Sequence, residues 1–166
     1  MVVTGSQGPV TAVLREALPL SLFLLQWASS GISSITRQPD GKLISVGTDN
    51  NNGLVFRLNE NGSLDTSFAA GGVHRPNIDQ ISNDRVTNSV VQPDGKIVIM
   101  GVTGDNTTSR RLFLLRYEAN GLLDPSFGDG GFIVHNLLNP YGELLLQSNG
   151  KFLTSSRDSN LDAATL

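Results

Sequence analysis

The stretch Gln92-Pro93-Asp94-Gly95-Lys96-Ile97-Val98-Ile99-Met100-Gly101 decides the fold, because it joins a tight-turn signal to a continuous apolar run. In such a turn proline fixes φ at the first corner, aspartate tolerates the second, and glycine takes the positive φ of a bulged hairpin. Two strands must therefore flank the turn. The run that follows shows no clean alternation with polar residues, which predicts a strand buried on both faces.

The same pattern occurs earlier in the chain as Arg37-Gln38-Pro39-Asp40-Gly41-Lys42-Leu43-Ile44-Ser45-Val46-Gly47. A degenerate third copy at 146–153 reads Leu-Gln-Ser-Asn-Gly-Lys-Phe-Leu and follows the second at nearly the same spacing. A second block, at 56–68, recurs at 115–127. The spacing between its two copies is slightly larger than the spacing between the copies of the turn. The larger offset predicts an inserted polar loop at 104–111. A near-constant period between recurring blocks is typical of a repeat architecture.

Each unit contains a second reversal at an Asn-Gly pair, so we expect at least three strands and favour four antiparallel ones. In the following Leu-Asp-x-Ser-Phe, aspartate can bond backbone amides of the next turn, and phenylalanine can anchor the link to the next unit. Gly-Gly pairs at 71–72 and 130–131 allow sharp bends. The structural repeat motif comprises Pro39, Asp40, Gly41, Asn61, Gly62, Asp65, Phe68, Pro93, Asp94, Gly95, Asn120, Gly121, Asp124 and Phe127.

These blocks resemble the bacterial delta-60 repeats, also described as a β-propeller domain of unknown function. The resemblance covers about Ile32 to Phe152 and depends on two ordered blocks recurring together. It implies a multi-bladed propeller in secreted, surface-associated or phage proteins, with no established catalytic residues to carry over. The third copy departs from the pattern, because Ser148-Asn149 replaces Pro-Asp.

The fold class is therefore expected to be all-β, with tandem antiparallel blades of a β-propeller. Only 16 % of residues are charged and 18 of 166 are glycine, which favours strands and turns over surface helices. We divide the chain into an N-terminal apolar segment at 1–31 and repeats at 32–166, with units at 32–86 and 87–140 and a partial unit at 141–166. Propellers close with about four to eight blades, so about two full blades form an incomplete propeller.

An apolar run at 17–28 is too short to span a membrane, which takes about 20 residues. We interpret it as a buried strand, a partial blade or an assembly contact, with a cleaved leader as the alternative. The candidate assembly contacts are Leu22, Phe23, Leu24 and Trp27. Because stacked repeats need neighbours to cover their terminal faces, we expect protein partners, either other copies of the chain or a larger assembly.

The sequence offers little for catalysis or for a cofactor. It contains no cysteine, and His74 and His135 occupy neither equivalent repeat positions nor a metal-ligand spacing. Ser67 and Ser126 lie in a repeated turn rather than a nucleophile elbow. A net charge of −3 with scattered cations does not favour nucleic-acid binding. We therefore expect a protein without enzymatic activity and without a cofactor or metal site.

Two kinds of binding site are alternatives to ordinary polar loops in this chain: a calcium site and a sugar-binding surface. Asp49 and Glu60 have the spacing of the first and twelfth positions of an EF-hand, but Leu54 stands where that loop requires glycine. A sugar-binding surface could use Tyr141, Trp27 and the polar tips at 49–53 and 104–109.

The leading functional hypothesis is a non-enzymatic structural or interaction module, extracellular or on a particle surface, with loops at 49–53 and 104–110 as its contacting face. One alternative is a phage virion component, such as a tail, fibre or decoration subunit. Another is a carbohydrate-binding or glycan-processing protein that meets a cell-surface glycan. The expected location is extracellular, at the cell surface or in a virion.

Overall fold

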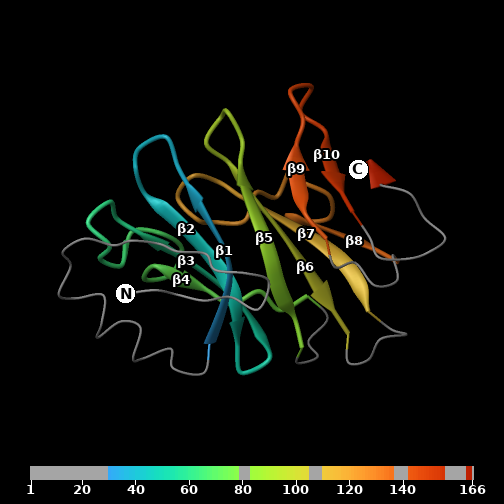
Figure 1. Ribbon diagram of the computed structural model, residues 1–166, viewed down its shortest axis with the longest axis horizontal. Helices are drawn as coiled ribbons and strands as arrows, with labels where there is room; N and C mark the ends of the chain where they lie inside the picture. The colour runs from blue at the N-terminus through green and yellow to red at the C-terminus, as the bar shows by residue number, and fades with distance from the viewer. Residues whose placement is uncertain (1–29, 79–82, 105–109, 137–141, 156–163, 166) are drawn as a thin grey trace.

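A computed structural model describes residues 30–78, 83–104, 110–136, 142–155 and 164–165. Every regular element in these ranges is a β-strand, and the strands form three antiparallel sheets (Figure 1). The prediction of an all-β fold built from tandem antiparallel blades is confirmed. Among the described residues, no helix has the length and apolar character that crossing a membrane would require.

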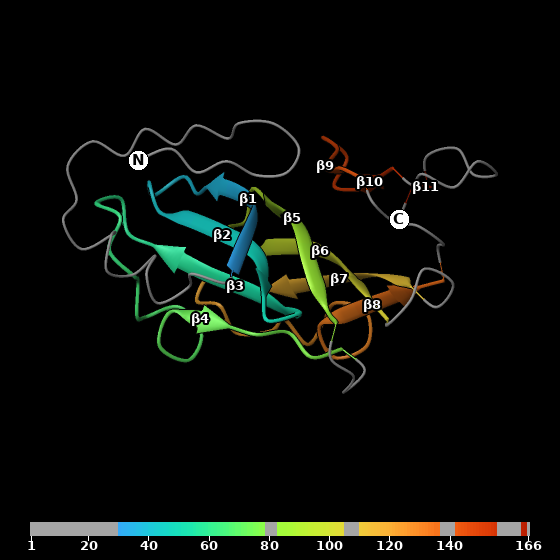
Figure 2. The ribbon, with the colours of Figure 1, turned by 60° about the horizontal axis from the view of Figure 1, so that its bottom comes forward.

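The first two sheets have the same four-stranded order and form the first and second blades (Figure 2). The first blade contains β1 (Ser30–Arg37), β2 (Leu43–Asp49), β3 (Asn52–Leu58) and β4 (Val73–His74). The second contains β5 (Arg85–Val91), β6 (Ile97–Thr103), β7 (Arg111–Tyr117) and β8 (Phe132–His135). β1 and β5 each begin slightly before the predicted start of a unit.

The third sheet forms a partial third blade. It contains β9 (Leu144–Leu146), β10 (Phe152–Thr154) and β11 (Ala164–Thr165), in the order β11-β10-β9. β9 and β10 therefore take the places that β1 and β2 hold in the first blade. The predicted partial unit at the C-terminal end thus contributes a sheet of its own.

The Gln-x-x-Gly-Lys segment forms the same hairpin turn in all three blades. Gly41, Gly95 and Gly150 have φ of 86°, 84° and 81°, the left-handed region in which glycine avoids a Cβ clash. In each copy the glutamine backbone N–H donates to the lysine carbonyl at 2.8 Å. The turn predicted from the sequence is confirmed, including its degenerate third copy.

A β-bulge also repeats between the first two strands of each full blade. The register shifts between Ile32 and Ser34 in the first blade and between Val86 and Asn88 at the equivalent position of the second. The opposing strand carries a glycine in each case, and a Cβ on Gly101 would clash with the Arg85 carbonyl oxygen. Glycine is needed at this position because the bulged strand lies too close to it for a side chain to fit.

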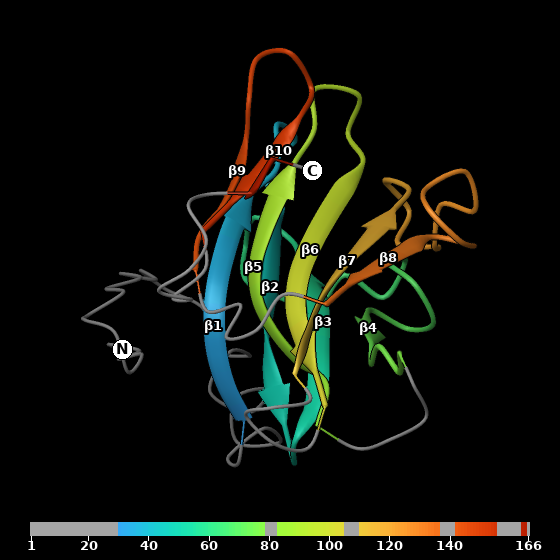
Figure 3. The ribbon, with the colours of Figure 1, turned by 90° about the vertical axis from the view of Figure 1, so that its right-hand side faces the viewer.

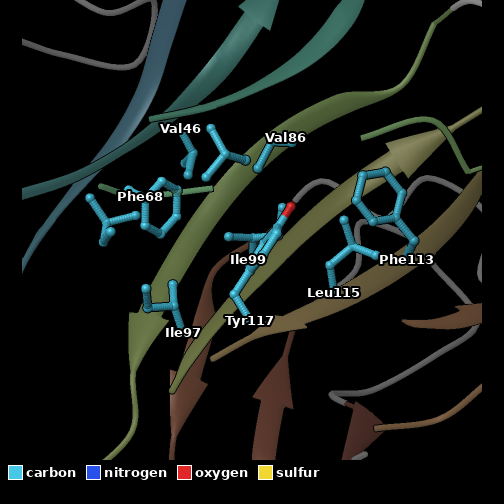
Figure 4. Close-up of a cluster of buried hydrophobic side chains, with 10 residues drawn as sticks. Val46, Phe68, Val86, Ile97, Ile99, Phe113, Leu115 and Tyr117 are labelled. Atoms are coloured by element: carbon cyan, nitrogen blue, oxygen red, sulfur yellow. The ribbon is translucent and has the colours of Figure 1, made fainter. Parts of the chain in front are cut away.

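β6 is buried along its whole length, as its apolar run predicted. Side chains alternate across a strand, so Ile97 and Ile99 face the first blade, whereas Val98 and Met100 face the third. Figure 4 shows the layer between the first and second blades, where Val46 lies beside Val86 and both belong to one cluster with Phe68 and Ile99. The core therefore consists of apolar layers between successive sheets.

The first strands of the blades also meet through polar side chains. β1 and β5 lie side by side (Figure 3), and the Thr36 hydroxyl donates to the Ser89 carbonyl oxygen at 2.8 Å. Between β5 and the segment leading into β9, Asn88 Nδ2 donates to Glu143 Oε2 at 2.9 Å. The blades are thus held in a common orientation at the edge formed by their first strands.

Candidate functional site

A buried ionic cluster closes the first blade. Asp65 Oδ2 accepts hydrogen bonds from Lys42 Nζ and Arg57 Nε, both at 2.8 Å. Its Oδ1 accepts from the Ser67 hydroxyl at 2.6 Å and from the Ser67 backbone N–H at 3.1 Å. Arg57 and Asp65 are almost fully buried, with 6 % and 7 % of their side chains exposed. Every strong acceptor direction of this carboxylate is therefore occupied.

The second blade contains the same cluster at equivalent positions. Asp124 Oδ2 accepts from Lys96 Nζ and Arg116 Nε, both at 2.7 Å. Its Oδ1 accepts from the Ser126 hydroxyl at 2.6 Å. Lys96 also pairs with Glu118 at 3.0 Å. Because both copies carry the same bonds, the cluster belongs to the repeat rather than to one active site.

Each arginine of the clusters also lies over the phenylalanine that ends its block. The Cζ atom of Arg57 is 4.8 Å from the Phe68 ring centroid, and that of Arg116 is 4.5 Å from the Phe127 centroid. A cation over an aromatic face gains stability from the ring quadrupole, most of all where water is excluded. Both phenylalanine rings belong to the apolar layers between blades. The arginines therefore connect the ionic clusters to the hydrophobic core.

Arg57 extends the first cluster into the second blade. Its Nη1 donates to the carbonyl oxygen of Ala119, and the Ala69 backbone N–H donates to Asn120 O at 2.9 Å. Gly121 completes this contact, because a Cβ there would lie 2.5 Å from the Phe68 ring. The Asn-Gly reversal of one blade is therefore a docking point for the blade before it.

The clusters hold both aspartates in the ionised form. Burial alone would raise the pKa of Asp65, but hydrogen bonds from Lys42 and Ser67 and the charge of Arg57 outweigh it and hold that pKa well below its usual range. For Asp124, the hydrogen bond from Lys96 is the main cause of a similarly lowered pKa. Carboxylates held in this form are poor general acids.

Both aspartates belong to the repeat motif identified from the sequence, but the partners of Lys42 and Arg57 were not predicted. A signal was present, since Arg57 precedes Asp65 by the same interval that separates Arg116 from Asp124. Two cations that recur with a recurrent aspartate indicate a shared ion pair. The contact itself depends on strands from different parts of the unit.

The two histidines end the fourth strands of their blades. His74 Nδ1 shares a hydrogen bond of 2.8 Å with the hydroxyl of fully buried Tyr117, so this pair joins the first and second blades. Burial lowers the pKa of His74 and raises that of Tyr117. His135 is exposed. Among the described residues, no group of three histidines or acidic side chains has a metal-binding arrangement.

The two acidic residues with EF-hand spacing, Asp49 and Glu60, are each paired with an arginine. Asp49 pairs with Arg75 at 3.0 Å, whereas Glu60 pairs with Arg37 at 3.4 Å. The two carboxylates at the first and twelfth positions of the EF-hand spacing thus have different cationic partners. Asn50 and Asn51 form the turn of the polar hairpin at 49–53, with positive φ of 47° and 66°.

Several predicted contact residues lie outside the part of the chain that the structure describes. They are Leu22, Phe23, Leu24, Trp27, Tyr141 and most of the loop at 104–110. The assembly contact predicted at 17–28 therefore stays a prediction.

Stacked four-stranded antiparallel blades, each closed by the same ionic cluster, define a β-propeller type of protein. The family model described as "Domain of unknown function (DUF5122) beta-propeller" matches residues 38–68 and 92–127. Both segments begin at the Gln-Pro-Asp-Gly-Lys turn and end at the phenylalanine that follows the cluster aspartate. Two segments of the chain thus match this β-propeller family model, which confirms the resemblance to delta-60 repeats. No curated protein matches the chain.

Proposed function

We propose that this protein is a non-enzymatic module whose blades serve structure and interaction. The observation that carries the proposal is the duplication of the ionic cluster, in which Asp65 and Asp124 are each saturated by two cations and a serine. An active site needs a group that is free to exchange protons or bonds with substrate. Carboxylates that are fully bonded in both repeats serve the blades instead.

We further propose that the module assembles with other copies of the chain. In the second blade, Val90 and Val98 are register partners whose side chains pack toward the third blade. Their equivalents in the third blade are Leu145 and Leu153, which are also register partners. This face of the third blade is therefore apolar, like the faces that lie between blades. No described blade covers it, and Leu145 is 57 % exposed. A further blade placed there would bury this leucine.

The assembly is tested by light scattering coupled to size-exclusion chromatography over a range of protein concentrations. We expect a defined oligomer for the wild-type chain and a shift toward monomer for Leu145→Glu. Leu122→Glu is the matched control, because Leu122 is 59 % exposed but belongs to the Asn-Gly turn of the second blade, where its backbone N–H bonds Asn120 Oδ1. A wild-type chain that stays monomeric at every concentration contradicts the assembly proposal.

An extracellular, cell-surface or virion location is part of the same proposal. An antibody raised against the chain should detect it in culture medium, on intact cells or in purified particles. Detection confined to the lysate of washed cells would reject this location while leaving the interaction role in place.

A further inference from the structure

A polar cavity lies at the seam between the first and second blades. Its volume is about 440 Å³, and the residues lining it are Gly31, Thr48, Asn50, Asn51 and Arg85. They come from β1, the end of β2, the β2–β3 turn and the first residue of β5, the neighbour of β1 in Figure 3. Small-molecule sites commonly have volumes of about 300–1,000 Å³ and lie between structural units.

The charge of this cavity is positive, although the chain as a whole has a net charge of −3. Arg85 is exposed, and no described residue forms an ion pair or hydrogen bond with its guanidinium. The nearby carboxylate of Asp49 is already bound to Arg75 at 3.0 Å and to Asn50 Nδ2 at 3.2 Å. Arg85 therefore remains available to an anion, and a guanidinium can bind both oxygens of a carboxylate at once.

Two further side chains offer neutral hydrogen-bonding groups to the same space. The hydroxyl of Thr48 and the amide of Asn51 make no hydrogen bond with the described part of the chain. Asn51 has a φ of 66° in the hairpin turn, a conformation that asparagine adopts more readily than most residues. A hydroxyl and an amide can each donate to and accept from the hydroxyl groups of a sugar.

The repeat does not require these residues. When the Gln-Pro-Asp-Gly-Lys turns of the two full blades are aligned, Gly31 and Thr48 correspond to Arg85 and Val102, so neither identity is kept. The residues that stabilise the blades, such as the cluster aspartates, are kept in both copies. A Cβ on Gly31 would meet no atom within 4 Å, which shows that this glycine leaves open space rather than relieving a close contact.

We propose that this cavity binds a sugar that carries a carboxylate, with Arg85 on the carboxylate and Thr48 and Asn51 on the sugar hydroxyls. The charge selects the acidic group, and the neutral groups select the polyhydroxyl ring. This site is separate from the face of the third blade that carries the assembly proposal, so either proposal can fail without the other.

The test uses the full chain labelled with ¹⁵N and titrates D-glucuronate, D-glucose and acetate while backbone amide shifts are recorded. We expect saturable shifts with glucuronate at the amides of Thr48, Asn51 and Arg85. Glucose lacks the carboxylate and acetate lacks the ring, so each should bind at least about tenfold more weakly. Acetate binding as tightly as glucuronate, glucose binding as tightly as glucuronate, or no saturable shift would overturn the proposal.

Three variants separate this site from general attraction to anions. Arg85→Gln should weaken glucuronate binding by about tenfold or more, because it removes the charged donor. Gly31→Phe should abolish binding by filling the cavity, and the open space beside Gly31 lets the blade fold. Arg37→Gln is the matched control, since Arg37 is an exposed arginine at the other end of β1. Undiminished binding in either of the first two variants, or an equal loss in the control, rejects the site.

Discussion

Replacing Asp65 with asparagine should destabilise the protein strongly, because it leaves a buried arginine without its counter-ion. The change keeps the size of the side chain and an acceptor for Ser67, but removes the charge that pairs with Arg57 and Lys42 at 2.8 Å. Lys42 has 30 % of its side chain exposed and can turn toward water, whereas Arg57 has only 6 % exposed. Breaking a buried pair in this way costs about 3 kcal/mol.

A loss of that size should lower the midpoint of thermal unfolding by about 6–12 °C in a chain of this length. Far-ultraviolet circular dichroism at neutral pH measures the midpoint, and urea unfolding measures the free energy. The control is Glu60→Gln, which breaks the exposed Arg37–Glu60 pair and should change stability by at most about 0.5 kcal/mol. Equal effects of Asp65→Asn and Glu60→Gln would refute the assignment of the cluster as a buried structural element.

A double variant tests whether the unpaired charge of Arg57 causes this loss of stability. Arg57→Met combined with Asp65→Asn removes both members of the buried pair, so no unpaired charge remains in the protein interior. Replacing both members of a buried pair is often close to neutral. We therefore expect the double variant to regain part of the lost stability. The recovery stays partial, because Arg57 also donates to the Ala119 carbonyl oxygen across the blade interface. A double variant less stable than Asp65→Asn alone would contradict the argument.

Two further predictions concern pH and packing. Asp65 and Asp124 have a lower pKa in the folded than in the unfolded chain, so their stabilising effect is complete above about pH 4 and is lost as the pH falls below the unfolded value. Unfolding midpoints measured from pH 7 to pH 2 should fall in that acidic range, and by less in Asp65→Asn. A midpoint that is constant or rises on acidification would contradict this. Gly101→Ala should cost about 2 kcal/mol, because its Cβ would clash with the Phe113 ring and with the Arg85 carbonyl oxygen, whereas Gly31→Ala should change little. Similar urea midpoints for the two alanine variants would count against the repeated bulge.

The sequence predicted the features of this fold that local chemistry determines. Gly41 and Gly95 mark turns because few other residues take a positive φ at low cost, and both turns form. The apolar run from Ile97 to Met100 is buried on both faces because it has no polar side to expose. These properties depend on neighbours in the chain, so a repeated motif is enough to predict them.

Features made by residues far apart in the sequence were not predicted. Lys42 meets Asp65 only after β2 and β3 pair, and Arg57 meets Ala119 only after two blades stack. The cavity has the same origin, since Thr48 and Arg85 belong to different blades. A single sequence does not state such distances, and the one signal it held for the cluster was that the lysine and the arginine recur together with the aspartate.

The third copy of the turn shows which part of the motif the fold requires. Ser148-Asn149 replaces Pro-Asp there, yet Gly150 keeps its φ of 81° and the hairpin closes with the same backbone bond of 2.8 Å. Asn149 Oδ1 accepts from the Lys151 backbone N–H at 3.0 Å, and Asp40 and Asp94 accept the equivalent bond at 3.1 Å. The turn therefore needs a glycine and a short side chain with an acceptor oxygen before it. Proline adds stiffness to the unfolded chain but is not needed for the turn geometry.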